Sequence, residues 1–255
     1  MRVVHCSDFH SMESHIKVPE CELLLCTGDY GKGRTTLEEM INFIHWLHEQ
    51  PAKQKVMIAG NHDMTLSRKL PSALDTDAVV RMLHLQKYQA VMANLEQYPD
   101  IKYLEDETFV YEGLKIHGMP WSPEFHPDNW VFNANPEQMI KALGKVPSDV
   151  NILLSHGPAY GYQDLIPQQY QRHPKEDLHR GSPEITSVIH RRLKKLKLFA
   201  FGHIHNSTYP GTTGADNYGI RMVRVTNTRS VLFSNGAVVD NDYNVVNKNP
   251  FIINL

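Results

Sequence analysis

Residues 56–63 read Val-Met-Ile-Ala-Gly-Asn-His-Asp, a short apolar run followed at once by polar side chains. Apolar runs of this length that are rich in branched residues are typical of buried strands. Four more runs of this kind each end in a side chain that can bind metal. The five segments are VVHCSDFH (3–10), LLLCTGD (23–29), VMIAGNHD (56–63), ILLSH (152–156) and LFAFGHIH (198–205). If all five strands belong to one sheet, these side chains meet at its carboxyl edge, where open α/β sheets form their sites.

The composition of the chain indicates one folded domain, which we place at residues 1–255. The 255 residues include 41% hydrophobic residues, enough to bury a full core. The net charge is -2, from 26 basic and 28 acidic residues. This near balance of charge argues against a protein that binds long nucleic acids through a strongly basic surface.

The sequence also indicates the cellular compartment in which the protein is expected. No apolar stretch approaches the length of a membrane span, and the chain starts directly on a predicted strand, without a charged and then apolar leader. Cys6, Cys21 and Cys26 form no CxxC pair, and two of them lie inside predicted strands, where cysteine usually acts as a small buried hydrophobe. We therefore expect a cytoplasmic protein without a membrane partner.

Helices and a hairpin are predicted around the five strands. The apolar residues of 37–47 recur at helical spacing, and Thr35 or Thr36 can cap this helix, which Pro51 closes. The further predicted elements are a helix over 72–95, a hairpin of 109–111 and 114–116, helices over 136–143 and 183–193, and antiparallel strands within 219–255.

Two stretches, 119–135 and 157–181, interrupt this pattern and are rich in proline, aromatic residues and histidine. Each is either a packed surface loop or part of a substrate rim. We favour the rim for 157–181, because it begins directly after His156, and leave the choice open for 119–135.

The polar residues at the strand ends are the oxygen and nitrogen donors that divalent cations bind. A two-metal centre also needs one carboxylate that can bridge the ions. Asp8 and His10 are two residues apart at a strand end and can bind one ion, whereas Asp29 stands alone and is the natural bridge. The other candidate ligands are Asn61, His156, His203 and His205, and His62 is left without a ligand role.

An isolated D-x-H or H-x-H motif is weak evidence in a chain with 15 histidines, but the ordered series is specific. The series DFH, GD, GNHD, SHG and GHIH resembles the motifs of the calcineurin-like metallophosphoesterases. Ser234-Asn235-Gly236 is similar to the closing strand and turn of that superfamily. Segments 116–123, 154–158 and 249–255 resemble, more narrowly, its metallophosphoesterase-domain-containing branch, which is similar to class III phosphodiesterases.

The resemblance implies a fold, a metal centre and a catalytic residue. The implied fold is a four-layer α/β/β/α sandwich of two mixed sheets flanked by helices, in place of a plain α/β sheet. Two divalent metal ions are implied, with manganese preferred over iron, zinc or nickel. By similarity, Asp8, His10, Asp29 and His205 hold metal one, Asp29, Asn61, His156 and His203 hold metal two, and His62 is catalytic.

The implied function is a phosphodiesterase that hydrolyses nucleotide phosphodiesters, cyclic nucleotides included. The mechanism would be in-line attack by a hydroxide that bridges the two ions. His62 would then stabilise the transition state or protonate the leaving oxygen. We expect a small nucleotide as the substrate and leave open the oligomeric state and the role of Asp63.

One departure from the sequence motifs of the superfamily narrows the range of expected substrates. Its protein phosphatases carry GDxxDRG, whereas residues 28–34 read GDYGKGR, with Lys32 in place of the second aspartate. The remaining alternatives are a nuclease, a phosphomonoesterase and a non-catalytic binding protein on the same fold. The near-neutral charge gives a nuclease little support, and no ligand or His62 is lost, as would be usual in a non-catalytic relative.

Other polar and aromatic residues have structural interpretations. We expect His126, His173 and His179 to be exposed on loops. We expect structural roles for His45, His48 and His84 in helices, and for the cations of 191–195 at a helix end. Trp121 is either a base-stacking residue or a packed tryptophan.

Overall fold

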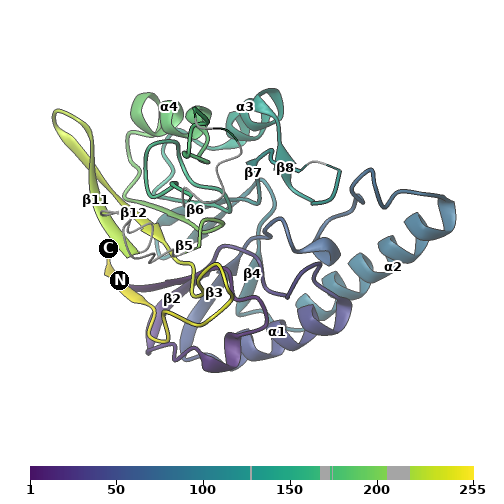
Figure 1. Cartoon of the computed structure of the whole chain (residues 1–255). Helices are drawn as coiled ribbons and strands as arrows, with labels where there is room; N and C mark the ends of the chain where they lie inside the picture. The colour runs from purple at the N-terminus through teal and green to yellow at the C-terminus, as the bar shows by residue number, and fades with distance from the viewer. Residues whose placement is uncertain (127, 167–172, 174, 206–218) are drawn as a thin grey trace.

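Two large sheets pack face to face, and a pair of helices covers the outer side of each sheet (Figure 1). The structure is a computed structural model and describes residues 1–126, 128–166, 173, 175–205 and 219–255. The layers follow the order helix, sheet, sheet, helix, which confirms the predicted four-layer α/β/β/α sandwich with mixed sheets. The hypothesis that all five motif strands share one sheet is wrong.

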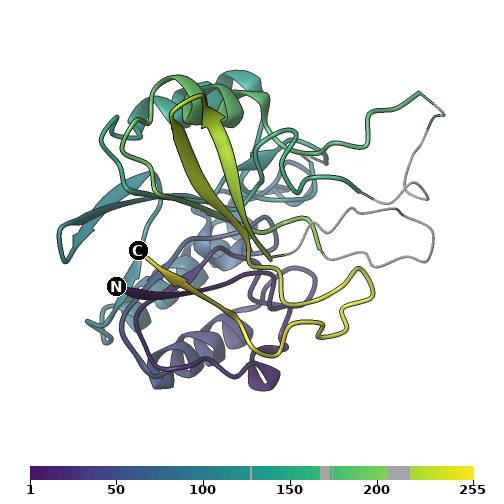
Figure 2. The same cartoon turned by 90° about the vertical axis from the view of Figure 1, so that its left-hand side faces the viewer.

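The first sheet contains the three N-terminal motif strands. Its strands, in spatial order, are β13 (Phe251–Asn254), β1 (Arg2–Cys6), β2 (Cys21–Cys26), β3 (Ala52–Met57) and β4 (Ile101–Tyr103). All neighbours are parallel except β13, which pairs antiparallel with β1. This pairing brings the two ends of the chain together, and the Met1 amino group donates to the Leu255 carbonyl over 2.9 Å (Figure 2).

The second sheet contains the two later motif strands. Its order is β11 (Gly219–Thr226), β12 (Arg229–Asn235), β10 (Leu198–Phe201), β9 (Ile152–Ser155), β6 (Leu114–Met119) and β5 (Glu107–Tyr111). The strands from β12 to β6 are parallel to their neighbours, and the antiparallel β11 and β5 form the edges. A small separate sheet pairs β7 (Ser122–Pro123) with β8 (Asn133–Ala134).

The division into layers explains why the motif strands are apolar on both faces. The side chains on one face of these strands fill the space between the two sheets. They include Val3, Leu25, Val56, Ile152 and Leu198. The alternate residues pack under the helices, because a strand turns successive side chains to opposite faces. The helices are α1 (Leu37–Glu49) and α2 (Ala78–Leu95) on the first sheet, and α3 (Pro136–Lys145) and α4 (Pro183–Arg191) on the second.

The helix boundaries differ in detail from those predicted. Thr36 caps α1 through a reciprocal pair of hydrogen bonds with Glu39, as one of the two predicted alternatives. Helix α2 begins at Ala78 instead of residue 72, because the Asp77 side chain accepts from the backbone N–H groups of Val79 and Val80. Helix α3 runs two residues beyond the predicted end, and α4 stops at Arg191. Short 3₁₀ turns lie at Glu13–His15 and Met64–Leu66.

The predicted hairpin is confirmed, with longer strands. Glu112 and Gly113 both have positive φ, 45° and 79°, as a tight two-residue hairpin turn requires. The prediction of antiparallel strands throughout 219–255 is wrong in part. Strand β12 is parallel to β10, and the described segment 236–250 is a connection that contains only isolated bridges. No described helix combines the length and the apolar character needed to cross a bilayer.

Candidate metal centre

The ends of β1, β2 and β3 in one sheet meet the ends of β9 and β10 in the other. The polar residues that follow these five strands therefore converge, although they come from two sheets instead of one. Two groups of side chains have ligand atoms that all lie within 4.8 Å of one another: Asp8, His10 and His205, and Asp29, His156 and His203. These groups contain six of the seven predicted ligands, and Asn61 contacts the second group.

The first group is a compact set of two imidazoles and a carboxylate. His10 Nε2 lies 3.1 Å from His205 Nε2, and Asp8 Oδ1 lies 3.4 Å from the same His205 nitrogen. Asp8 and His10 are fully buried. Two ring nitrogens that face each other at this distance, with a carboxylate beside them, leave a position where a cation would contact all three.

The second group is arranged around the Asn61 side chain. Asn61 Oδ1 lies 2.9 Å from His156 Nε2 and 2.8 Å from His203 Nδ1. Asp29 Oδ2 lies 3.3 Å from His156 Nε2 and 4.0 Å from His10 Nε2, so it faces both groups. This position between the groups is the one that a bridging carboxylate would need.

Contacts behind the imidazoles favour metal binding. The Nδ1 atoms of His10, His156 and His205 face the backbone carbonyls of Gly31, Thr27 and Asp240, at 3.2, 2.7 and 3.2 Å respectively. A carbonyl only accepts, so each Nδ1 carries a proton and each Nε2 faces the centre, where it can bind a cation once it carries no proton. Metal-bound histidines usually show this outer hydrogen bond, which fixes the tautomer and the ring orientation.

The donor set also fits divalent cations by charge. Asp8 and Asp29 are buried, and within the described part of the chain they form ion pairs with histidines. Two buried carboxylates without a lysine or arginine are stabilised by bound cations. Imidazole nitrogens with carboxylate and amide oxygens suit manganese, iron, zinc or nickel. The residues therefore fit two metal ions, and the ligand roles of the individual residues stay predictions.

The pKa values reflect the close packing of these groups. Burial lowers the pKa of both His10 and His203 to about 3, so both are neutral and can act as ligands. Burial also opposes the charge of His156, but the neighbouring Asp29 outweighs it and raises the pKa of His156 to about 9. In Asp8, the effect of burial is outweighed by the hydrogen bond to His205 together with the charges of His205 and His156, which bring the pKa to about 2. Without metal, positive charge on histidine compensates the carboxylates, and a cation would take that place.

The backbone is strained at several predicted ligands. Asp8, His10, Asp29 and His203 have φ values of 54°, 46°, 57° and 69°, in the left-handed region that non-glycine residues rarely adopt. Strained residues of this kind cost about 1–3 kcal/mol each and are concentrated at functional sites. The sharp turns aim the side chains across the strand ends. Gly202 makes one close approach possible, because a Cβ there would lie 2.1 Å from Asp8 Oδ2.

His62 lies beside the two groups without joining them. Its backbone N–H donates to Asp29 Oδ1 over 2.8 Å, and its Nδ1 donates to the Gly33 carbonyl. The Nε2 atom therefore faces the centre, 3.9 Å from Asp29 Oδ2. His62 belongs to neither ligand group, and its catalytic role stays a prediction.

Asp63 connects the segments that carry Asp29 and Asn61. Asp63 Oδ2 accepts from the backbone N–H groups of Asp29 and Gly60, over 2.8 and 2.7 Å. Its Oδ1 accepts from the backbone of Tyr30 and from the Thr35 hydroxyl, each over 3.0 Å. Burial, together with the charge of Asp29, raises the pKa of Asp63 to about 7. The role that the sequence left open is therefore to hold two ligand loops together.

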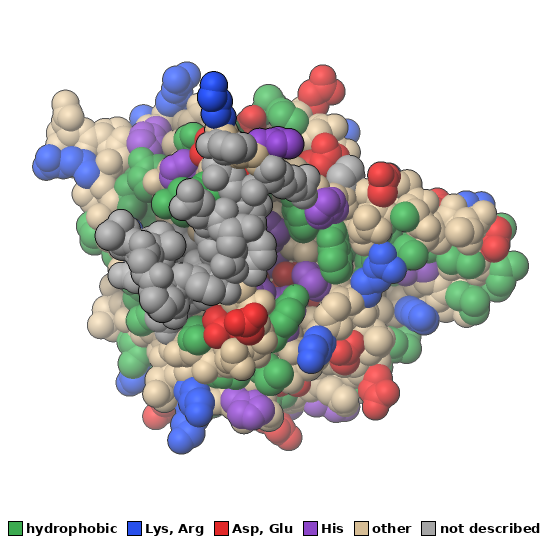
Figure 3. Space-filling view, viewed as in Figure 1, with side chains coloured by type: hydrophobic (Ala, Val, Ile, Leu, Met, Phe, Trp, Pro, Cys, Tyr) green, Lys and Arg blue, Asp and Glu red, His purple; other side chains and the backbone are tan. Residues whose placement is uncertain are grey.

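A cavity of about 230 Å³ opens onto the centre. In Figure 3 histidine and acidic side chains are visible at the floor of a hollow near the middle of the face. The residues that line it are Asp29, Asn61, His62, Phe125, His203, His205, Asn241 and Tyr243. Phe125, Asn241 and Tyr243 were not predicted as site residues, because none of them follows one of the five motif strands. The Tyr243 ring lies 4.7 Å from the His10 ring.

Both stretches that interrupt the strand pattern border this region. Phe125 and Trp130 of 119–135 contact the His203 and His62 rings, with centroids 5.2 and 4.2 Å apart. In 157–181, Arg180 shares a neighbouring cavity with His203. Residues 127, 167–172 and 174 of these stretches lie outside the described residues. Residues of both stretches therefore border the site, and a role as substrate rim stays a prediction.

The predictions for the histidines outside the centre and for Trp121 are confirmed in part. His126 and His173 are exposed as expected, but His179 is partly buried and lies 2.6 Å from Asp164. His84 is buried and donates to the Ser67 carbonyl, which confirms a structural role. Trp121 donates to Asp106 and packs on Phe132, as a packed tryptophan does. Asn235 belongs to the predicted closing turn and donates to the Ile204 carbonyl between two predicted ligands.

Comparisons with known proteins agree with this geometry. A family model described as calcineurin-like phosphoesterase matches residues 1–207. The chain is 30% identical over 260 residues to human metallophosphoesterase domain-containing protein 1, covering 100% of this chain and 71% of the human protein. It is 28% identical to the UPF0046 protein T07D4.2 of Caenorhabditis elegans, over 74% of this chain and 47% of that protein. One solved crystal structure aligns with 92% of this chain and 89% of its own at a TM-score of 0.54 and 14% identity, which supports the fold.

Proposed function

The chain belongs to the calcineurin-like phosphoesterase family, and from this premise we propose that it is a two-metal phosphodiesterase that hydrolyses nucleotide phosphodiesters. The observation that carries the proposal is the position of Asp29. Its Oδ2 atom faces His156 Nε2 at 3.3 Å and His10 Nε2 at 4.0 Å. One buried carboxylate between two sets of ligands is the arrangement that two-metal hydrolases use.

Each side chain has a role in this proposal. Asp8, His10 and His205 would hold one ion, Asn61, His156 and His203 the other, and Asp29 would bind both. Bound there, the cations would supply a water of lowered pKa and would neutralise charge on the phosphoryl oxygens. The protein fixes the imidazole tautomers through backbone carbonyls and buries five of the seven candidate ligands, Asp8, His10, Asp29, Asn61 and His156.

His62 supplies the proton chemistry. Its Nδ1 is engaged by the Gly33 carbonyl, so Nε2 is the atom that faces the substrate and passes a proton to the leaving oxygen. General acid catalysis of this kind contributes roughly 10²–10⁴ in rate. Because this proton helps a poor leaving group more than a good one, the contribution of His62 depends on the ester.

The substrate proposal rests on what the site contains and lacks. Lys32 replaces the second aspartate of the protein-phosphatase motif, and the cavity over the centre is about 230 Å³, which suits the phosphoryl part of a small molecule. We therefore propose a small nucleotide diester, cyclic or linear, with manganese as the preferred metal. A phosphomonoesterase, a nuclease and a non-catalytic binding protein are the alternatives that the experiment distinguishes.

The test combines metal analysis with a substrate panel. Purified protein is stripped with a chelator, reloaded with manganese, iron, zinc or nickel, and assayed on an aryl phosphodiester. We expect no turnover without metal, two bound ions per chain after loading, and the best recovery with manganese. The kcat/KM values of cyclic nucleotides, linear diesters, nucleoside monophosphates, single-stranded DNA and a phosphoserine peptide are then compared.

Each alternative has its own outcome. Less than one bound ion per chain together with no turnover would favour the non-catalytic protein. Faster hydrolysis of nucleoside monophosphates or of DNA would favour the phosphomonoesterase or the nuclease. A preference for the phosphoserine peptide would contradict the assignment of the substrate class.

A further inference from the structure

A second and larger cavity lies next to the metal centre. Its volume is about 630 Å³, within the range of about 300–1,000 Å³ that is usual for small-molecule sites. Phe125 and His203 line both this cavity and the one over the centre. A ligand whose phosphorus lies at the centre can therefore extend into the second cavity past the Phe125 ring.

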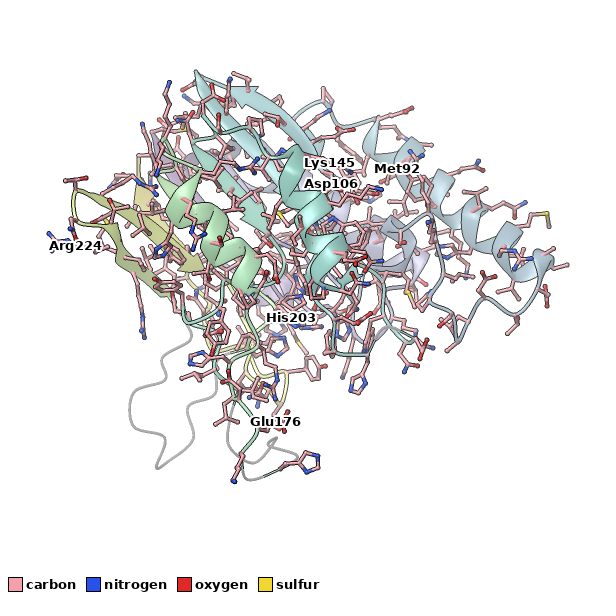
Figure 4. All side chains as sticks on the ribbon, turned by 90° about the horizontal axis from the view of Figure 1, so that it is seen from above. Met92, Asp106, Lys145, Glu176, His203 and Arg224 are labelled. Carbon is pink, nitrogen blue, oxygen red and sulfur yellow. The ribbon has the colours of Figure 1, made fainter. Side chains whose placement is uncertain are left out.

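The larger cavity is formed by segments that follow β7 of the small sheet and β9 and β10 of the second sheet. Its lining residues are Pro123, Glu124, Phe125, Ile166, Glu176, Arg180, His203 and Ile204, all within β7 or the segments that follow β7, β9 and β10. His62, by contrast, follows β3 in the first sheet. In the view of Figure 4 the labelled Glu176 lies near the lower edge, below the labelled His203, and both residues line the cavity. No residue of the first sheet lines the larger cavity in the described part of the chain, whereas His62 reaches the centre from the first sheet.

Phe125 offers a flat apolar surface at the junction of the two cavities. Its ring centroid lies 5.2 Å from that of His203, with the planes inclined by 53°. The Phe125 backbone N–H donates to the Asn133 side chain over 3.3 Å, which ties this part of the loop to β8. Pro123, Ile166 and Ile204 add apolar surface around the ring.

The charged residues of the cavity do not favour a second anion. Arg180 Nη2 lies 2.6 Å from Glu176 Oε1, and Arg180 Nη1 also donates to the His179 carbonyl over 3.1 Å. The guanidinium is therefore already engaged by an acidic and a carbonyl group. Glu124 adds a further negative charge at the same cavity. The described lining thus carries two carboxylates and one arginine.

We propose that this cavity binds the organic group that stays on phosphorus, and that it selects a flat heteroaromatic ring stacked on Phe125 over a group that carries a second phosphate. The inference rests on the proposed phosphodiesterase function and adds the subsite that recognises the nucleoside. The leaving group would then depart on the side of His62. A nucleoside with one phosphorus fits this arrangement, whereas a nucleoside diphosphate or a nucleic acid strand would bring phosphate against Glu124, beside an arginine that is already paired with Glu176.

The first experiment compares two diesters with the same leaving group. Manganese-loaded protein is assayed on the p-nitrophenyl ester of thymidine 5′-monophosphate and on methyl p-nitrophenyl phosphate. Stacking of a base on an aromatic side chain is worth roughly tenfold or more in binding. We expect Phe125→Ala to lower kcat/KM for the thymidine ester at least about tenfold more than for the methyl ester. Phe125→Trp should keep most of the selectivity, and Ile140→Ala, which truncates an exposed side chain on α3, should leave it unchanged.

The second experiment needs no turnover. Binding of AMP and ADP to the manganese-loaded protein is measured by calorimetry, and AMP should bind at least as tightly as ADP. Phe125→Ala should weaken the binding of AMP. Glu124→Gln should strengthen the binding of ADP relative to that of AMP. If the wild-type protein hydrolyses neither diester, the proposed phosphodiesterase function is contradicted. The calorimetric measurement still tests the subsite, because it needs no turnover.

Two results would overturn the subsite. One is that Phe125→Ala lowers kcat/KM equally for both diesters and leaves the binding of AMP unchanged. The other is wild-type binding that is much tighter for ADP than for AMP and insensitive to Glu124→Gln.

Discussion

The indole ring of Trp130 lies against the imidazole ring of His62, with the ring centroids 4.2 Å apart and the planes inclined by 36°. The His10 ring meets the same imidazole edge to face, at 4.9 Å. Together with the hydrogen bond from His62 Nδ1 to the Gly33 carbonyl, these contacts restrict both torsions of the side chain. His62 is therefore oriented by a residue, Trp130, that belongs to the segment between β7 and β8.

Removal of the indole should lower kcat through His62. We expect Trp130→Ala to reduce kcat about tenfold with little change in KM, because the imidazole loses its orientation while the metal ligands stay in place. Trp130→Phe should recover most of the activity. In a His62→Ala background, Trp130→Ala should cause no further loss, since the residue through which it acts is gone. Additive losses in the double variant would contradict this coupling.

Asp29 and His62 should separate metal binding from proton transfer. Asp29→Ala removes the carboxylate that faces both groups, so bound metal and activity should fall together. His62→Ala should keep both ions and slow turnover by roughly 10²–10⁴, more for an alkyl leaving group than for nitrophenolate, which leaves without a proton. His45→Ala, at an exposed position of α1, is the matched control. If His62→Ala strips metal as fully as Asp29→Ala, then His62 is a ligand.

Asp63 should be required for the integrity of the centre even without metal. An asparagine has one carboxamide oxygen, so in Asp63→Asn its NH₂ group would face two of the four donors that the carboxylate now satisfies. An unsatisfied buried donor costs about 1–3 kcal/mol, and we expect the free energy of unfolding to fall by about 3 kcal/mol. Urea unfolding in a chelator measures this change, with the exposed Asp242→Asn as control. An unchanged unfolding curve would show that the loops are held by other contacts.

The candidate ligands were predictable because each follows a short apolar strand in the sequence itself. Asp8, Asn61 and His156 are recognised from the strand that precedes them, whichever sheet it joins. The partition into two sheets was not visible in this way, since it depends on which strands pair. The periodicity of β10 says nothing about its neighbours β9 and β12, and only the resemblance to a known family indicated two sheets.

The residues that surround the ligands were harder to predict. Phe125, Trp130 and Tyr243 come from connections without periodicity, and their positions depend on packing between distant segments. Asp63 belongs to the GNHD motif, but its role depends on hydrogen bonds to Asp29 and Tyr30, more than 30 residues away. Local patterns specify strand ends, whereas the rim of the site is set by tertiary contacts.

His5 should make the stability of the protein fall in acid. It is fully buried in β1, where Nδ1 lies 2.8 Å from the Ser234 hydroxyl and Nε2 lies 2.9 Å from the Thr27 hydroxyl. Burial lowers the pKa of His5 to about 3, from about 6.5 in the unfolded chain. Between these two values the unfolded state binds one more proton at this residue than the folded state. The contribution of His5 is therefore complete above pH 6.5 and is lost as the pH falls below that value.

Substitution of His5 should reduce this acid sensitivity. One proton corresponds to about 1.4 kcal/mol of unfolding free energy per pH unit. His5→Gln keeps a polar side chain between the two hydroxyl groups without a titratable ring. We expect the loss of stability between pH 6.5 and pH 5 to be smaller in His5→Gln than in the wild-type protein by about 1–2 kcal/mol, although the variant is less stable at pH 7.5. Urea unfolding at a series of pH values in a chelator measures both curves, and parallel curves would mean that His5 is protonated in the folded protein.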